Sequence, residues 1–279
     1  MKDEHAETNE RTGLLASLKE LWSTQRAPLI ILVTVPLALT FLEYWGMPWH
    51  YTRYNERVVT YRPPARQYRV VDPAKNPPLA DLIQHVNVPG PDRVKPYLWW
   101  SAACLLCMVV LPIGAGLLAG ARPRSLGLKI KGTGREALTY LGLYALFFPV
   151  LWVVSGRAEF QETYPFFEPK GGALDQEFLI FQAAYCLQFF AVEFFFRGFM
   201  VLGLKPYLGW ASVLVMLAPY CMIHYYKPMP EALGAVGAGI VLGALAFRSG
   251  TIIYGWFLHY GVALTMDMLS LYRTDRLAG

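Results

Sequence analysis

Long apolar runs constrain this chain more than any other feature. Blocks of mostly apolar residues recur along the sequence, separated by short basic or Pro-rich segments. Runs of about 20 apolar residues can cross a bilayer as α-helices, whereas strands and loops leave backbone polar groups unsatisfied there. Only 16% of the 279 residues are charged, against about a quarter in an average soluble protein. The sequence therefore predicts an all-α, polytopic membrane protein.

The apolar runs also predict how the chain is divided. We expect a cytoplasmic N-terminal segment, a first transmembrane helix, a Pro-rich extramembrane loop, two further helices with their loops, a core of four helices and a short tail. These segments cover residues 1–27, 28–46, 47–96, 97–176, 177–271 and 272–279. About seven transmembrane helices result, with the last four at residues 177–204, 210–223, 232–247 and 251–271. No internal repeat is evident.

Basic residues indicate the orientation. Five of them and no acid lie between the second and third predicted helices, at Arg122, Arg124, Lys129, Lys131 and Arg135. Because short cytoplasmic loops are enriched in Lys and Arg, we expect this loop and the N-terminus in the cytoplasm. The longer loop 47–96 carries eight basic residues and argues the other way, but long loops weigh less. With no N-terminal targeting peptide evident, the pattern favours a bacterial inner membrane.

Composition excludes several function classes. The net charge of +5 is small and spread over loops, which gives no argument for nucleic acid as a partner. Cys104 and Cys107 form a CxxC pair, but inside an apolar run and without a second pair. Thiolates that bind metals or carry redox chemistry need a polar, positive setting. We therefore expect Cys104, Cys107, Cys186 and Cys221 to be packing residues without a structural disulfide.

One stretch departs from generic membrane sequence. Glu193 and Arg197 lie four residues apart within the apolar, aromatic run 191–200. On a helix these positions share a face, so the two charges can pair. A charge at the bilayer centre costs at least about 2.5–3.5 kcal/mol on insertion scales, and such residues usually mark functional sites. The three phenylalanines between them are expected to pack or to face lipid.

Few other ionisable residues lie within the late helices. His224 directly follows the fifth predicted helix, His259 lies in the seventh, and Asp267 follows two turns later on the same face. Glu231 is expected to begin the sixth helix, where the helix dipole favours a carboxylate. Two histidines and a Glu–Arg pair on neighbouring helices are most economically explained by one polar pocket inside the bundle.

Such a pocket supports hydrolytic chemistry. A carboxylate beside histidines can take a proton from water and later return it to a leaving amine, and a histidine can donate to a developing oxyanion. No serine or cysteine is placed as a nucleophile, so an activated water is the natural attacking group. A zinc site is the close rival, because two histidines and a carboxylate are a legitimate ligand set. There is no HExxH, and we expect no metal and no cofactor.

At these residues the chain resembles the CPBP family of CAAX proteases and bacteriocin-processing enzymes, which are intramembrane glutamic endopeptidases. The resemblance covers roughly residues 177–270 and rests on three ordered motifs. The first is a glutamate pair followed after three residues by arginine, then Gly and an aromatic; here it runs from Val192 to Phe199. The second places an aromatic four residues before histidine, at Tyr220 and His224. The third is a histidine with asparagine four residues later, at His259 and Ala263.

The chain departs from the family pattern at two positions of the catalytic motifs. The family's first glutamate, taken as the water-activating base, is Val192 here, and its asparagine is Ala263. The resemblance implies that Glu193 is the base or an orienting carboxylate, paired with Arg197, and that His224 helps to activate water. His259 then donates to the oxyanion, with Asp267 as its expected partner, and Tyr220 lines the pocket.

The hypothesis is therefore an intramembrane endopeptidase acting on a membrane-associated protein or peptide. Its substrate would be a lipidated tail, a leader peptide or a C-terminal anchor. The alternative is a non-catalytic relative that binds membrane peptides as a chaperone or immunity factor, which the missing first glutamate supports. A proton-coupled carrier is a third option, and the lack of internal repeats argues against it.

Overall fold

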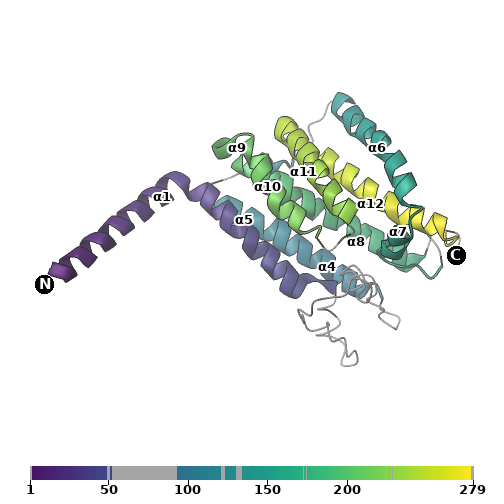
Figure 1. Cartoon of the computed structure of the whole chain (residues 1–279), viewed down its shortest axis with the longest axis horizontal. Helices are drawn as coiled ribbons and strands as arrows, with labels where there is room; N and C mark the ends of the chain where they lie inside the picture. The colour runs from purple at the N-terminus through teal and green to yellow at the C-terminus, as the bar shows by residue number, and fades with distance from the viewer. Residues whose placement is uncertain are drawn as a thin grey trace.

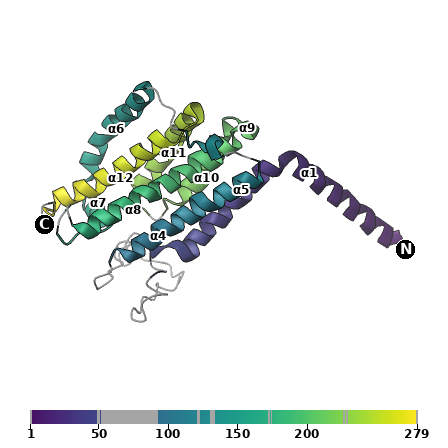
Figure 2. The same cartoon turned by 180° about the vertical axis from the view of Figure 1, so that it is seen from behind.

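The computed structural model describes residues 2–48, 51, 93–120, 123–129, 134–171, 173, 175–225, 227 and 229–277. The side chains of residues 2–16, 18, 21, 123 and 124 lie outside this description. Every regular element among the described residues is a helix, which confirms the predicted fold class (Figures 1 and 2). The predicted loop 47–96 falls almost wholly outside the described residues.

Five helices are long and apolar enough to cross a membrane. They cover Trp22–Gly46, Lys95–Leu118, Gly134–Val154, Gln176–Leu208 and Met229–Ser249. The protein is therefore an integral, multi-pass membrane protein.

The predicted count of about seven spans is not confirmed. The helix α10, Ala211–Met222, is apolar but has only 12 residues. Its length of about 18 Å falls short of the roughly 30 Å hydrocarbon core. The helix α12, Ile253–Arg273, has 21 residues but is not among the five. It carries polar residues that lower its hydropathy, among them His259, Asp267 and Ser270.

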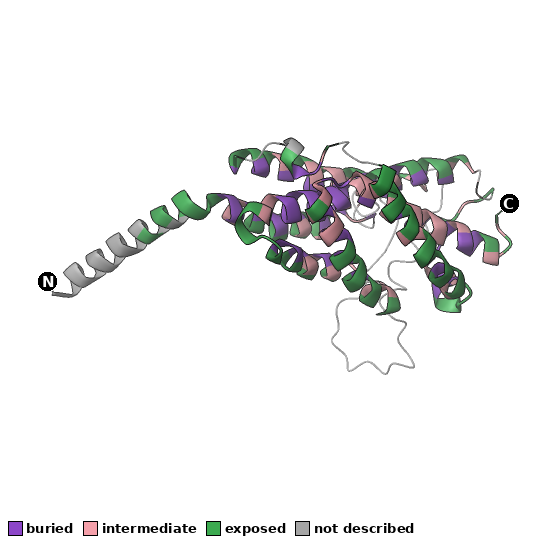
Figure 3. Ribbon diagram, turned by 90° about the horizontal axis from the view of Figure 1, so that it is seen from above, coloured by how far each residue is buried: buried purple, intermediate pink, exposed green. Residues whose placement is uncertain are grey.

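The first half of the chain forms one side of the bundle. The helix α1, Lys2–Phe41, runs into a π-helical turn, η1 at Leu42–Gly46. Its beginning projects away from the other helices and is exposed where its side chains are described (Figures 1 and 3). Its later part lies along α5, Leu111–Leu118, and the π-helical turn η2, Leu106–Val110, while η1 contacts α4, Lys95–Leu105. Together these helices cover one side of the central helix.

The central helix is the most buried of the candidate spans. It consists of α8, Gln176–Glu193, the π-helical segment η5, Phe194–Leu202, and α9, Gly203–Leu208. The side chain of Asp175 caps its first turn by accepting from the backbone N–H groups of residues 177 and 178. Of its most apolar stretch 61% is buried, against 11% for the peripheral helix α6, Gly134–Val154.

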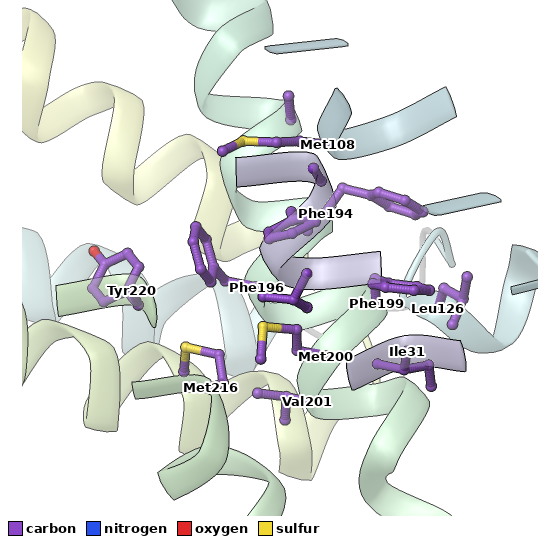
Figure 4. Packing of buried hydrophobic residues seen from close by; sticks show 14 of the residues in the cluster. Ile31, Met108, Leu126, Phe194, Phe196, Phe199, Met200, Val201, Met216 and Tyr220 are labelled. Atoms are coloured by element: carbon purple, nitrogen blue, oxygen red, sulfur yellow. The ribbon is translucent and has the colours of Figure 1, made fainter. Parts of the chain in front are cut away.

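A core of apolar side chains surrounds η5. Phe194, Phe195 and Phe196 are fully buried, which confirms their predicted packing role and excludes lipid contact. Figure 4 shows how Phe199 and Met200 continue this core toward α1 and the short helix η3, Pro123–Leu126. Cys104 and Cys107 are buried in the same core, and all four cysteines of the chain are free.

Glycines allow the closest helix contacts. A Cβ on Gly198 would lie 2.5 Å from the Leu126 carbonyl oxygen, so only glycine lets η3 pack on η5. On α11, Met229–Ser249, a Cβ at Gly239 would lie 3.0 Å from the Tyr220 ring, and one at Gly243 would lie 2.9 Å from Val213. These two glycines bring α11 against α10.

The helix α6 packs at the edge of the bundle, beside α12 (Figure 1). Tyr140 stacks on Tyr254, and the Tyr144 hydroxyl lies 2.6 Å from that of Thr265. Only Tyr140 and Leu151 of α6 are buried. Most of its other side chains are free to contact lipid.

Candidate active site

The predicted Glu–Arg pair lies where the central helix changes its winding. Glu193 is the last residue of α8, and Arg197 lies in the π-helical segment η5. Glu193 Oε1 and Arg197 Nη1 are 3.1 Å apart, and both residues are fully buried. The ion pair expected from the four-residue spacing is therefore formed. π-helical turns are rare and often occur at functional sites.

His259 meets this pair from the neighbouring helix α12. Its Nδ1 lies 2.8 Å from Glu193 Oε1, the same oxygen that faces Arg197. Gly255, one turn earlier on α12, allows the close approach, because a Cβ there would lie 3.0 Å from Glu193 Oε2. The His259 side chain is 17% exposed, whereas that of Glu193 is 1% exposed. The histidine is thus the more accessible member of the pair.

Tyr220 links the remaining predicted site residues. It lies near the end of α10, and its ring contacts Arg197, with the guanidinium carbon 4.0 Å from the ring centroid. The centroids of the His224 and His259 rings lie 4.7 Å and 6.4 Å from that of Tyr220. The turn that follows α10 thus places His224 beside the same ring that contacts Arg197 and His259. The structure therefore brings together all four predicted catalytic residues and Tyr220.

The protonation of His224 follows from its surroundings. Its Nδ1 lies 2.8 Å from the Tyr220 carbonyl oxygen, which can only accept, so Nδ1 carries the proton. Burial, assisted by the nearby Lys227 ammonium, lowers the pKa of His224 to about 3. The ring is neutral at physiological pH, with Nε2 as an acceptor.

The Glu193 cluster is incompletely hydrogen-bonded. Glu193 Oε2 is buried without a hydrogen-bond partner among the described residues. The Arg197 guanidinium is held by the charge of Glu193 and by the face of the Tyr220 ring, but none of its nitrogens forms an aligned hydrogen bond there. Buried polar groups normally find partners, so this cluster retains unused donors and an unused acceptor.

Asp267 belongs to a separate cluster. The Asp267 carboxylate accepts from the Phe166 backbone N–H at 3.0 Å and from Gln182 Nε2 at 2.7 Å. The expected partnership between Asp267 and His259 is therefore wrong. Eight residues separate the two, or about 12 Å along a helix, which no carboxylate can reach across. Asp267 instead fixes the loop after α7, Ala158–Thr163, to α8 and α12.

Sequence reasoning missed two contributors. Nothing in the sequence singles out Gly255, whose importance depends on which helix lies opposite Glu193. The cluster of Glu231, Tyr164 and Lys227 also went unrecognised. In it Glu231 accepts from the Tyr164 hydroxyl at 2.9 Å and from Lys227 Nζ at 2.6 Å. Glu231 does lie in the first turn of α11, as predicted, and this group ties that turn to the loop after α7.

The zinc alternative requires several ligands around one point. Within the described part of the chain, no three His, Cys, Asp or Glu side chains are grouped as ligands of one ion would be. The donors that do converge are one carboxylate, already paired with a guanidinium, and two imidazoles.

Comparison with known families bears on the same residues. Residues 175–265 match a family model described as Rce1-like, type II CAAX prenyl endopeptidase Rce1-like. The match runs from the start of α8 into α12 and includes Glu193, Arg197, His224 and His259. It confirms the predicted resemblance to the CPBP family, a family of membrane proteases. No curated protein and no solved structure matches the chain.

Proposed function

From the Rce1-like match over residues 175–265, we propose that this protein is an intramembrane endopeptidase. It hydrolyses a peptide bond of a membrane-associated protein or peptide by means of an activated water. The observation that carries this proposal is the contact of Glu193 Oε1 with both Arg197 and His259 inside a helical bundle. A carboxylate paired with an imidazole is an arrangement that can serve general acid–base catalysis of hydrolysis.

The proposed reaction needs no covalent enzyme intermediate. The Glu193–His259 pair takes a proton from water, whose oxygen attacks the substrate carbonyl carbon to give a tetrahedral intermediate. The same proton passes to the amide nitrogen as the C–N bond breaks, which releases a carboxylic acid and an amine. The only hydrogen bonds of the two imidazoles are to Glu193 and to the Tyr220 carbonyl among the described residues, so neither activates a serine or a cysteine.

His224 assists this step as a neutral acceptor. With Nδ1 bonded to the Tyr220 carbonyl, its Nε2 can accept a hydrogen bond from water. Tyr220 holds His224 through its backbone and contacts Arg197 and His259 through its ring. Substitution of Tyr220 is therefore expected to disturb three site residues at once.

The proposed substrates follow from where the site lies. A pair buried among membrane helices suits a peptide that is itself held in or at the bilayer, such as a lipidated tail, a leader peptide or a C-terminal anchor. The name of the matched family makes a prenylated C-terminal tail the first to test. The Lys and Arg residues of loop 122–135 support a cytoplasmic position of this loop, in a protein that crosses a bacterial inner membrane several times.

The test is cleavage of defined peptides by the purified protein in lipid nanodiscs. Fluorogenic peptides with and without a C-terminal farnesyl cysteine should be cut by the wild type, and His259→Ala should abolish cleavage. Glu162→Gln, an acid-to-amide change on the exposed surface of α7, serves as the control and should behave as wild type. Mass spectrometry of the products identifies the bond that is cut.

A second function is favoured by one observation. Val192 stands where the matched family's pattern has its first glutamate, so a chain that binds membrane peptides without cutting them is the alternative. Saturable binding of the same peptides by the wild type, with no product over days, would establish that alternative and sink the protease proposal.

A further inference from the structure

The direction of one hydrogen bond assigns the protons in the site. Glu193 Oε1 also faces the Arg197 guanidinium at 3.1 Å, so the carboxyl group is an ionised acceptor with no proton to donate. The contact of 2.8 Å with His259 must therefore run from Nδ1–H to the carboxylate. A neutral imidazole has one N–H only, so His259 Nε2 carries the lone pair.

Burial separates the two members of the pair. Glu193 is fully buried, and its Oε1 is already shared by a guanidinium and an imidazole. The backbone of Gly255 packs against its other oxygen, Oε2. His259 is 17% exposed, and no hydrogen bond to its Nε2 is formed by the described residues. Of the two, His259 is the one that a water or a peptide can contact.

We propose that His259 Nε2 is the general base of the reaction and that Glu193 is a positioning residue. This inference rests on the proposed endopeptidase function and divides the roles within it. It reverses the expectation from the sequence, in which Glu193 takes the proton and His259 serves the oxyanion. The arrangement follows the logic of a carboxylate that fixes the tautomer and orientation of a catalytic histidine.

The proton balance of the step is complete. Water transfers a proton to His259 Nε2 while its oxygen forms a bond to the substrate carbonyl carbon, and the π electron pair moves onto the carbonyl oxygen. The imidazolium, stabilised by Glu193, then protonates the amide nitrogen as the C–N bond breaks. Glu193 remains a carboxylate throughout, and one water is consumed.

Several titratable or charged groups surround His259. The titratable or charged side chains that the described residues place near this part of α12 include Glu193, Arg197, Tyr220, His224, Tyr140 and Tyr144. His224 is held neutral by burial and by Lys227, which lower its pKa to about 3. Phenols and guanidinium groups titrate above about pH 10. Substitution of His259 and of Glu193 separates the two candidate bases within this set.

The first experiment is the pH dependence of kcat/KM for the wild type, Glu193→Gln and His259→Gln. The acid limb of this profile reports the base, so the variant that loses the limb identifies it. We expect the acid limb of the wild type to depend on His259. Glu193→Gln should keep that limb with activity about 10²–10⁴-fold lower, because the tautomer is no longer fixed. His259→Gln should show no limb and only residual activity.

Two results overturn the assignment. A wild-type limb that persists in His259→Gln and vanishes in Glu193→Gln makes Glu193 the base, while the endopeptidase function stands. A wild type that cuts none of the peptides overturns the proposed function and the catalytic assignment together. Glu162→Gln, the same chemical change at an exposed site, should retain the wild-type profile.

A second experiment reads the tautomer without activity. In protein labelled with ¹⁵N-histidine, His259 is assigned by comparison with His259→Gln. At pH 8 the wild type should show a protonated Nδ1 and an unprotonated Nε2, and Glu193→Ala should shift the ring toward a mixture of tautomers. A proton on Nε2 in the wild type would exclude this nitrogen as a base.

Discussion

Two buried polar clusters lie between the same two helices, and they are built differently. One joins Glu193 on α8 to His259 on α12, and the other joins Gln182 on α8 to Asp267 on α12. The two helices run antiparallel. The clusters are separated by 11 residues on α8 and by 8 on α12, so they lie about 12–16 Å apart along the helix axes. Both consist of polar groups in an otherwise apolar interior.

The clusters differ in how completely their groups are bonded. Both oxygens of Asp267 accept a hydrogen bond, one from Phe166 and one from Gln182. In the other cluster Glu193 Oε2 and the guanidinium of Arg197 lack aligned partners among the described residues. A buried polar group left unsatisfied costs about 1–3 kcal/mol. An incompletely bonded cluster, more than the mere presence of charge, thus marks the site suited to chemistry.

The largest effect should come from breaking the Glu193 ion pair. In Glu193→Ala, peptide cleavage should fall at least about 10³-fold, and the uncompensated Arg197 should cost about 3–5 kcal/mol of stability. The double variant Glu193→Leu/Arg197→Met removes both charges and should recover most of that stability without recovering activity. Thermal unfolding in detergent and peptide cleavage measure the two effects. Full stability of Glu193→Ala would contradict the buried pair.

The Asp267 cluster should show the opposite profile. In Asp267→Asn the side-chain oxygen can still accept from the Phe166 N–H, but the new NH₂ group faces the NH₂ group of Gln182, so two donors meet. We therefore expect a stability loss of about 1–3 kcal/mol. Cleavage by the folded protein should stay within about threefold of wild type. A loss comparable to that of Glu193→Ala, in protein that unfolds normally, would place Asp267 in the reaction.

A smaller effect should follow from a single methyl group beside Glu193. In Gly255→Ala the new Cβ would lie 3.0 Å from Glu193 Oε2, so the carboxylate must shift by a few tenths of an ångström. We expect about a tenfold loss of kcat, since small misplacements of catalytic groups are costly. The control is Gly237→Ala on α11, where a Cβ meets nothing within 4 Å. Equal activities of the two variants would remove Gly255 from the site.

The smallest predicted effect concerns the ionisation of His224. Lys227 lies near the imidazole and contributes to lowering its pKa to about 3, after burial. Lys227→Gln should therefore raise the pKa of His224, which remains below the ordinary value because the burial persists. Loss of the partly exposed Lys227–Glu231 pair should cost at most about 1 kcal/mol. Titration followed by NMR of ¹⁵N-histidine checks the shift, and a lowered pKa would contradict it.

Much of the local structure could be predicted from the sequence. The predicted helices 177–204 and 251–271 correspond to Gln176–Leu208 and Ile253–Arg273. The spacing of Glu193 and Arg197 correctly predicted their pairing. These features depend on consecutive residues of one helix, where length, apolarity and the i, i+4 relation are fixed by the chain itself.

Partners across helices were harder to predict. Asp267 was expected beside His259 because the two share a face, yet it meets Gln182 and Phe166 at another level. The π-helical winding of residues 194–202 has no signal in the sequence that we recognise. Gly255 is an ordinary small residue until Glu193 is known to lie against it.

The sequence by itself determined that the chain is a helical membrane protein and that Glu193, Arg197, His224 and His259 are its costly polar residues. Only the tertiary structure decided which of them touch, which oxygen of Glu193 is shared, and that Asp267 supports a loop. The physical reason is that helix formation is governed by neighbouring residues. The axial shift and rotation that place one helix against another depend on the packing of every side chain between them.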